Sequence, residues 1–192
     1  MQRQLQQRTQ RGNVMLKNTL ARYGWVAMSL HWIIAILIIG MLGLGLYMKA
    51  LPVSLEKLKL YGWHKEFGLL VLMLATFRVG WRFANITPAL PGDMPLLDKF
   101  LAHSVHFALY ILMFAMPITG WLLTSAAGLP PSFFGLFVLP SLVAPNQELF
   151  NLFGQVHFWL GCAFIGLICA HTGAALQHHF IKKDDILRRI LP

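Results

Sequence analysis

The chain has 192 residues, of which 57% are hydrophobic and only 12% charged, and its formal net charge is +9 at pH 7. Soluble globular domains carry about 25% charged residues, so this composition excludes an ordinary soluble domain. Proteins that bind nucleic acid gather Lys and Arg on a soluble face, whereas here these residues lie between and outside apolar blocks, so no nucleic-acid binding is expected.

Four apolar blocks follow one another along the chain, at about residues 25–48, 61–83, 100–126 and 149–180. Each block is long enough to cross a hydrocarbon core of about 30 Å, which requires about 20 residues of helix. Residues 1–22 form a basic, polar tail, and residues 182–192 form a second tail of mixed charge. The sequence therefore predicts an all-α fold, an integral membrane four-helix bundle over residues 23–181.

The connections between the blocks are rich in proline. Residues 85–98 form one such loop, and Pro117 is expected to kink the third helix. The apolar stretch 128–147 carries four of the chain's 10 prolines, which argues against another spanning helix there. Its phenylalanines, Phe133, Phe134 and Phe137, suggest that this loop lies on the membrane surface or folds over the bundle.

The basic residues set the predicted orientation. Four crossings place both ends of the chain on one side of the membrane. Twelve of the 16 Lys and Arg fall on that side, and the other four are Lys49, Lys57, Lys59 and Lys65. Because cytoplasmic loops carry the excess of Lys and Arg, both tails are predicted to be cytoplasmic.

The histidines point to a cofactor. Most of the 8 histidines lie in or near the apolar blocks, where an ionisable side chain is costly and usually functional. A hydrogen bond between helices would explain one such histidine, but it is a poor explanation for so many of them. His157 and His171 are 14 residues apart, which is about 21 Å and nearly four turns of helix, so they point from one face toward opposite leaflets. This spacing suits two stacked haems, because imidazole is a common axial ligand of haem iron.

The predicted topology sorts the remaining histidines by depth. His64 shares the outer level with His157, and these two would hold an outer haem. His31 shares the inner level with His171, but His106 also begins the third helix at that level. Depth alone therefore leaves the two inner axial positions open among His31, His106 and His171.

Several further residues fit this arrangement, each with a simpler alternative. Gly45 follows His31 by 14 residues and would leave room for the outer macrocycle, although small residues also serve ordinary helix packing. Arg78 follows His64 by 14 residues and could pair with a haem propionate, although an interfacial arginine can also snorkel. Neutral histidines near the cytoplasmic side, such as His178, could relay protons to a quinone.

A set of motifs resembles one known family over residues 22–192. They are Ser29-Leu30-His31-Trp32, His64 at the start of the second helix, Leu101-Ala102-His103-Ser104-Val105-His106, the series His157, His171, His178 and His179, and Phe180-Ile181-Lys182-Lys183-Asp184 followed by Leu187 and Pro192. Together they are similar to the bacterial cytochrome b561 family. The resemblance implies a multi-pass protein of the bacterial inner membrane that holds two haems b.

The resemblance also implies the ligands of both haem irons. It pairs His31 with His171 at the inner haem and His64 with His157 at the outer haem, and so releases His106. An iron with two histidine ligands has no free position, which favours outer-sphere electron transfer over ligand binding.

In the superoxide oxidase members of that family, electrons pass from superoxide at the periplasmic face to ubiquinone at the inner face. The quinone site there resembles the surroundings of Ser29, His106 and His178. We therefore predict a cytochrome that passes electrons from the periplasmic side, from superoxide or another donor, to ubiquinone or menaquinone. The outer lysines, Lys49, Lys57, Lys59 and Lys65, could attract an anion such as superoxide.

Two other functions stay open at this point. The same fold serves as the cytochrome b subunit that relays electrons between a partner dehydrogenase or hydrogenase and quinone. A haem-free transporter that carries intramembrane histidines is the third class. An optical spectrum of the purified protein separates this last class from the other two.

Overall fold

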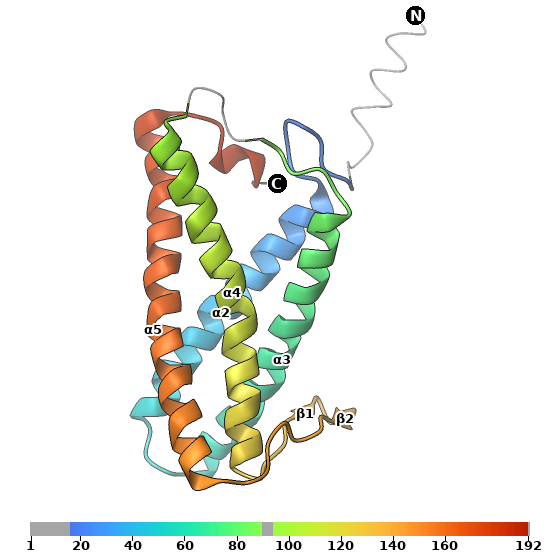
Figure 1. Ribbon diagram of the computed structural model, residues 1–192, viewed down its shortest axis with the longest axis vertical. Helices are drawn as coiled ribbons and strands as arrows, with labels where there is room; N and C mark the ends of the chain where they lie inside the picture. The colour runs from blue at the N-terminus through green and yellow to red at the C-terminus, as the bar shows by residue number, and fades with distance from the viewer. Residues whose placement is uncertain (1–15, 90–93, 192) are drawn as a thin grey trace, which may run out of the picture.

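The computed structural model describes residues 16–89 and 94–191. Within these ranges four long α-helices form an up-and-down bundle (Figure 1): α2 (Trp25–Ala50), α3 (Leu55–Phe83), α4 (Leu96–Ala126) and α5 (Gln147–Gln177). Most of the predicted tail 1–22, including Arg3, Arg8 and Arg11, lies outside the described residues, as do Pro91 of the second loop and Pro192.

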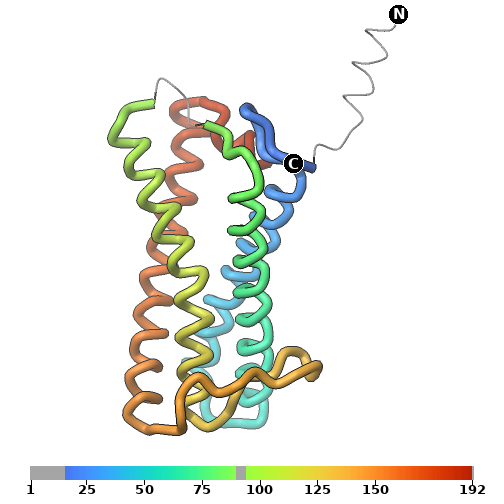
Figure 2. Tube along the Cα trace, turned by 45° about the vertical axis from the view of Figure 1, so that its right-hand side comes forward, coloured from blue at the N-terminus to red at the C-terminus, as the bar shows by residue number. Residues whose placement is uncertain are grey.

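The two ends of the bundle differ in what they contain (Figures 1 and 2). Residues 16–24, the start of α2 and the C-terminal residues up to 191 lie at one end, which we call the terminal end. The α2–α3 and α4–α5 connections lie at the opposite end, which we call the distal end. Consecutive helices pack against each other, α2 on α3, α3 on α4 and α4 on α5.

Two helices begin earlier than their hydropathy predicts, because their first turns contain charged residues. α3 starts at Leu55 instead of about residue 61: the Ser54 hydroxyl accepts a hydrogen bond from the backbone N–H of Lys57 at 3.1 Å, and Glu56 lies in the first turn. A side-chain cap and an acidic first turn both stabilise a helix N-terminus. α4 starts at Leu96, directly after Pro95, instead of about residue 100.

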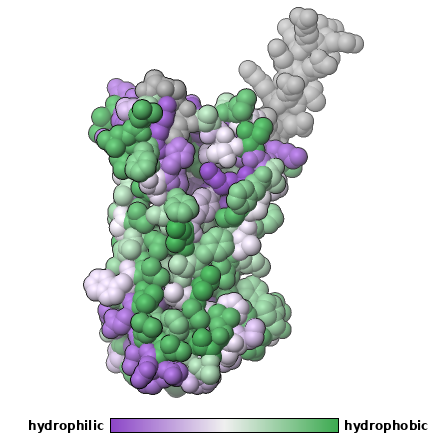
Figure 3. Space-filling view, viewed as in Figure 1, coloured by the Kyte–Doolittle hydropathy of each residue, from purple (hydrophilic) through white to green (hydrophobic). Residues whose placement is uncertain are grey.

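Three of the described helices are long and apolar enough to cross a membrane: α2, α4, and α5 together with the π-helical turn η1 (His178–Lys182). α3 has a similar length of 29 residues, but charged side chains at both of its ends lower its mean hydropathy. Apolar side chains cover the middle of the visible face and hydrophilic ones gather toward its two ends (Figure 3). This distribution is typical of a helical bundle in a bilayer.

All four helices contribute to one apolar core midway between the two ends, with Leu30, Ile34, Ile38, Val71, Ala75, Leu112, Met113 and Phe164 as its buried members. Phe164 is seven residues from His157 and seven from His171. Since lipid tails are as apolar as these side chains, close packing rather than the hydrophobic effect stabilises such a layer in a membrane. The core therefore separates the histidines of one end from those of the other.

The connection at residues 128–147 contains a short antiparallel hairpin that the sequence does not predict, formed by β1 (Ser132–Phe133) and β2 (Phe137–Val138). Its turn uses Gly135 at φ 71° and also Phe134 at φ 48°, in the left-handed region that favours glycine. The Phe134 ring packs against Phe67 of α3 with centroids 5.4 Å apart. The hairpin thus lies beside α3 at the distal end (Figure 1).

The C-terminal segment, residues 183–191, folds back over the terminal end. Lys183 turns the chain with a φ of 55°, and a short 3-10 helix, η2 (Leu187–Arg189), follows. Arg189 donates from Nη1 to the Ala89 carbonyl at 2.6 Å, and the Trp32 indole donates to the Ile190 carbonyl at 2.9 Å. These bonds tie the end of the chain to α2 and to the α3–α4 connection.

Candidate functional site

The structure gathers histidines into two clusters, one near each end of the bundle. The distal cluster consists of His64 of α3 and His157 of α5, whose ring centroids are 6.2 Å apart with an interplanar angle of 75°. In the terminal cluster, His31 of α2 and His171 of α5 have centroids 6.4 Å apart at 72°. All four side chains are half-buried. Two similar imidazole pairs therefore lie on opposite sides of the apolar core.

The terminal cluster contains a third imidazole. The His106 ring lies 5.1 Å from that of His171 at an interplanar angle of 67°, which is closer than His31. His103, one turn earlier on α4, instead directs Nδ1 to the Lys99 carbonyl of its own helix at 2.6 Å. The ambiguity that depth leaves among His31, His106 and His171 thus persists in three dimensions.

A large cavity of about 680 Å³ surrounds the distal pair and draws its walls from all four helices. Ligand pockets in proteins typically measure about 300–1,000 Å³. Two of its glycines lie directly against the imidazoles: a Cβ on Gly45 would lie 3.4 Å from Cε1 of His64, and one on Gly120 would lie 3.3 Å from Cε1 of His157. Each glycine therefore lets its helix backbone lie directly against an imidazole. Gly45, which the sequence singles out, lines this cavity.

The two distal imidazoles differ in their hydrogen bonds. Nδ1 of His157 lies 3.0 Å from the hydroxyl of Thr119 on α4. Nδ1 of His64 is buried and has no hydrogen-bond partner among residues 16–89 and 94–191. Sequence reasoning does not find Thr119, because a single threonine inside an apolar block carries no periodic signal.

A guanidinium supplies positive charge at the terminal cluster. Arg78 of α3 donates from Nη1 to the Ala27 carbonyl at 3.1 Å, and its Nη2 lies 3.4 Å from Nδ1 of His31. The second distance is long for a hydrogen bond. In N–H···O hydrogen bonds the donor and acceptor atoms are usually about 2.7–3.2 Å apart. The structure therefore brings Arg78 to the depth that the 14-residue spacing predicts, against α2.

The three residues predicted to surround a quinone all lie toward the terminal end, but they do not form one bonded group. Ser29 is exposed on α2, and His106 is exposed on α4. His178 opens η1 and forms an ion pair with Asp184. Among the described residues, no hydrogen bond or ring contact joins Ser29, His106 and His178 to one another. No pattern in the sequence identifies Asp184 as a partner of His178.

Basic side chains lie at the mouth of the distal cavity. Lys49 and Lys65 both line it. The Lys49 ammonium lies 3.4 Å from the centre of the ring of Phe158, which also lines the cavity. Lys57, which is outside this lining, donates to the Leu51 carbonyl at 2.7 Å. Positive charge therefore accumulates on the rim of a cavity whose interior is largely apolar.

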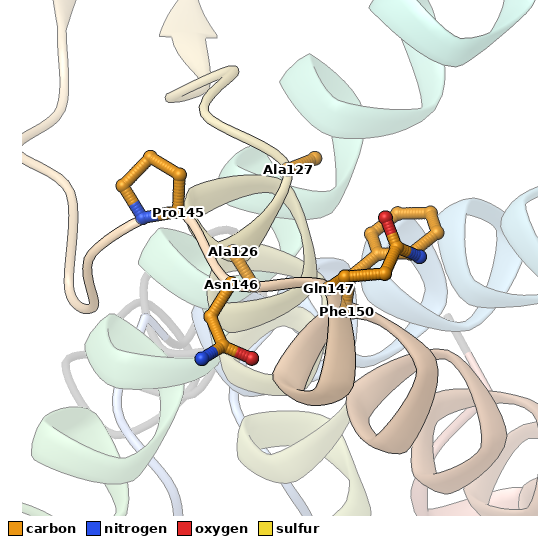
Figure 4. Close-up of a pocket in the computed structure, with 6 residues that line it drawn as sticks. All are labelled: Ala126, Ala127, Pro145, Asn146, Gln147 and Phe150. Carbon is orange, nitrogen blue, oxygen red and sulfur yellow. The ribbon is translucent and has the colours of Figure 1, made fainter.

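A second hollow, of about 400 Å³, lies where α4 ends and α5 begins (Figure 4). Its walls are Ala126, Ala127, Pro145, Asn146, Gln147 and Phe150. Asn146 caps α5 by accepting a hydrogen bond from the Leu149 N–H at 2.9 Å, so its side chain has a structural role. These residues carry no acid, base or nucleophile, and we assign the hollow no chemistry.

The imidazole pairs suit a haem better than a bare metal ion. Among the described residues, no group of three or more His, Cys, Asp or Glu side chains could hold an ion by itself. A protein-bound transition metal usually takes at least three or four ligands from side chains and water. A haem brings its own ring nitrogens and needs only axial ligands, and an opposed imidazole pair can supply both of these.

Comparison with known proteins agrees with this chemistry and confirms the resemblance stated for the sequence. The family described as prokaryotic cytochrome b561 matches residues 22–192. The chain is 38% identical over 182 residues to cytochrome b561 homolog 2 of Escherichia coli (strain K12), which covers 91% of this chain and 93% of that protein.

Two further relatives have related names. Cytochrome b561 homolog 1 of Escherichia coli (strain K12) is 35% identical over 130 residues, covering 67% of this chain and 73% of that protein. A probable superoxide oxidase, CybB, of Yersinia pestis is 27% identical over 172 residues, covering 89% and 96% respectively. With its apolar helices and its intramembrane histidines, the chain belongs to the prokaryotic cytochrome b561 family of haem-binding, electron-transferring membrane proteins.

Proposed function

We propose that this protein is a di-haem b cytochrome that carries electrons from its distal end to a quinone at its terminal end. The proposal rests on the two imidazole pairs, in which the two ring centroids are 6.2 Å apart at the distal end and 6.4 Å apart at the terminal end. Two metal–imidazole bonds of about 2.0–2.1 Å, plus the distance from each nitrogen to its ring centre, separate two ring centroids by roughly 6 Å. Both pairs have the spacing that one iron between two imidazoles requires.

In this proposal, His64 and His157 are the axial ligands of the outer haem, and His31 and His171 are those of the inner haem. The distal cavity around the first pair gives the outer macrocycle its space. When bound, the haems would supply one-electron carriers held by these histidines. His106, which is exposed on α4, is then left for other chemistry.

Arg78 is proposed as a partner of a propionate of the inner haem. An axial His31 that binds iron through Nε2 carries its proton on Nδ1, so this nitrogen cannot accept a hydrogen bond from Arg78. The long Nη2–Nδ1 contact of 3.4 Å is therefore expected to open when the haem binds. A carboxylate is the acceptor that a guanidinium then binds best.

The proposed orientation follows from charge. We infer that α3 also crosses the bilayer, because it packs between α2 and α4 and connects the two ends of the bundle. The Lys and Arg residues of the terminal end outnumber those near the distal end, where Lys49, Lys57, Lys59 and Lys65 lie. The positive-inside rule then places the distal end in the periplasm and both termini in the cytoplasm of a bacterial inner membrane.

The proposed reaction joins superoxide to quinone, as the name of the Yersinia pestis relative suggests. Two superoxide anions each lose one electron at the distal end and become oxygen. One ubiquinone or menaquinone takes up the two electrons and two protons at the terminal end and becomes a quinol. Ser29, His106 and His178 are proposed to surround the quinone. The Asp184 carboxylate beside His178 is proposed to pass protons between water and that imidazole.

The test uses the purified full-length protein in detergent. Its optical spectrum is expected to contain b-type haem at a ratio of two per chain. Superoxide is expected to reduce this haem without a partner protein, and added ubiquinone is expected to reoxidise it. Haem that superoxide cannot reduce would favour the relay subunit of a partner dehydrogenase or hydrogenase, and a preparation without haem would favour the transporter.

The lysines at the cavity mouth sharpen this test. Replacing Lys49 and Lys65 by Glu is expected to slow haem reduction by superoxide about tenfold or more at low salt, because a local positive field raises the encounter rate of an anion. Lys183→Glu, at the opposite end, is the matched control and leaves the rate unchanged. Equal rates for all three proteins at low salt would show that these lysines do not attract the donor.

A further inference from the structure

The distal pair contains one feature that the proposed haem ligands do not explain, the hydroxyl of Thr119. We propose that Thr119 is a positioning residue that holds His157 in a single tautomer and orientation, with the proton on Nδ1 and the lone pair of Nε2 available to iron. This inference rests on the proposed assignment of His157 as an axial ligand. Thr119 lies on α4, the helix that supplies no axial ligand in that assignment.

The direction of the hydrogen bonds follows from counting protons. The Thr119 hydroxyl lies 2.9 Å from the Met116 carbonyl and 3.0 Å from Nδ1 of His157. A hydroxyl has one proton to donate, and a carbonyl oxygen can only accept. Two oxygens 2.9 Å apart require that proton between them, so Thr119 donates to Met116. Its oxygen then accepts at the second contact, and Nδ1 of His157 is the donor.

This direction fixes which nitrogen can bind iron. A neutral imidazole carries its proton on one nitrogen and a lone pair on the other. With the proton on Nδ1, the lone pair lies on Nε2, and only a lone pair coordinates a metal. Histidines that bind metals usually donate their second ring N–H to an acceptor in this way, which fixes the tautomer and raises the basicity of the ligand.

The neighbouring residue completes the arrangement. A Cβ on Gly120 would lie 3.3 Å from Cε1 and 3.6 Å from Nδ1 of His157, so the imidazole packs directly on the backbone of α4. Gly120 therefore fixes the position of one edge of this ring, and Thr119 fixes its tautomer. His64 lacks such a partner among the described residues, so the two ligands of one iron are unequal.

Loss of the Thr119 acceptor has a predictable effect on the outer haem. A more basic imidazole stabilises the ferric state more than the ferrous state, so the hydrogen bond lowers the reduction potential. Thr119→Val keeps the shape and removes the hydroxyl acceptor, and it leaves the Met116 carbonyl as the other acceptor near this ring. We expect about a tenfold change of the ferric/ferrous equilibrium, which is about 59 mV upward for a one-electron couple.

The experiment is an optical redox titration of the purified holoprotein in four forms: wild type, Thr119→Val, Thr119→Ser and Thr76→Val. The serine variant keeps the hydroxyl and is expected to restore the wild-type potential. Thr76 is the matched control, because its hydroxyl also donates to a carbonyl of its own helix, that of Leu72 at 2.8 Å, and because it lies outside the lining of the distal cavity. A potential that stays unchanged in Thr119→Val, or that shifts equally in Thr76→Val, overturns the proposal.

A fifth form separates this inference from the haem assignment. His157→Ala is expected to lose the outer haem. If it keeps both haems, the ligand assignment is wrong. If it loses one haem while Thr119→Val behaves as wild type, only the role of Thr119 is wrong. If Thr119→Val does not accumulate, the serine variant still decides, because a shift as large as 59 mV in it contradicts a role for the hydroxyl.

Discussion

The distal and terminal histidine clusters share one spacing and differ in nearly everything around it. Their imidazole pairs have centroids 6.2 and 6.4 Å apart at similar angles. The distal pair faces a largely apolar cavity and meets one neutral hydroxyl. The terminal pair has a third imidazole and a guanidinium beside it. Under the proposed assignment, one ligation chemistry operates in two different electrostatic settings.

This difference matches what each end has to exchange with water in the proposed reaction. An electron that enters from superoxide brings no proton with it, so the distal end needs only a positive rim. A quinone that becomes a quinol takes protons, so the terminal end needs groups that hold and pass them. The surplus imidazole of His106 and the His178–Asp184 pair are such groups, and both lie at the terminal end.

The largest expected effect is the loss of one haem when a ligand histidine of either cluster is replaced. His157→Ala and His171→Ala are each expected to lose one of two haems, because removing one axial imidazole leaves its iron with a single protein ligand. His106→Ala is expected to keep both haems and to slow quinone reduction. The haem-to-protein ratio from the optical spectrum measures the first effect, and the rate of quinol formation measures the second.

The same series can reverse the inner assignment. His106 lies nearer to His171 than His31 does, so a ligand pair of His106 and His171 is the specific alternative. If His106→Ala loses a haem while His31→Ala keeps both, the inner ligands are exchanged and His31 becomes the free imidazole.

The sequence predicts the depth of each histidine well, and depth explains why the two clusters exist. The 14 residues between His157 and His171 set two levels on one face of a helix, with Phe164 midway between them. Depth cannot rank His31 against His106, because rotation about each helix axis and the packing of α2, α4 and α5 decide which rings meet. The structure places both rings near His171, so the order of the two stays open there as well.

Polar partners and helix ends were harder to predict, for physical reasons. Thr119 acts through a single hydroxyl that also bonds to its own helix, so no spacing pattern reveals it. The C-terminal segment docks mainly through backbone carbonyls, such as those of Ala89 and Ile190, and every residue type has a carbonyl. Hydropathy also missed the polar first turn of α3, where Ser54 is the cap.

A medium effect concerns the charge beside the terminal pair. Arg78→Gln removes a cation near His31 and is expected to lower the reduction potential of the inner haem, because a nearby positive charge favours the state with one more electron. At an effective dielectric constant of about 20, a unit charge roughly 10 Å away contributes on the order of 1.5 kcal/mol. For one electron this is roughly 60 mV. A redox titration measures it.

Arg82→Gln is the matched control for Arg78. It lies one turn further along α3, is exposed, and places its guanidinium over the Tyr110 ring at 5.7 Å. Its substitution is expected to shift the inner potential less, because solvent screens an exposed charge. Equal shifts of the inner potential from both variants would mean that only the net charge of the terminal end matters. A shift of the outer haem potential alone would contradict the placement of Arg78 beside the inner haem.

The smallest expected effect is a pH dependence confined to the terminal end. Arg189 lies 2.9 Å from Asp185. The hydrogen bond from Arg189 holds the pKa of the Asp185 carboxyl below its usual range. Because the folded pKa is depressed, the pair's contribution to stability is complete above the ordinary value of about 4 and disappears as the pH falls through the folded value.

Hydrogen exchange followed by mass spectrometry can detect this contribution in residues 184–191. Asp185 is 59% exposed, so solvent screening limits the pair to about 0.2–1 kcal/mol, at most about a fivefold change in opening. Asp185→Asn is expected to open the segment faster than wild type at pH 6, and the difference between the two proteins is expected to vanish below the folded pKa. The hairpin at residues 132–138 is the internal reference, since it lies at the opposite end. If the hairpin changes as much as the C-terminal segment, the two ends are coupled through the bundle, and the clusters do not have independent surroundings.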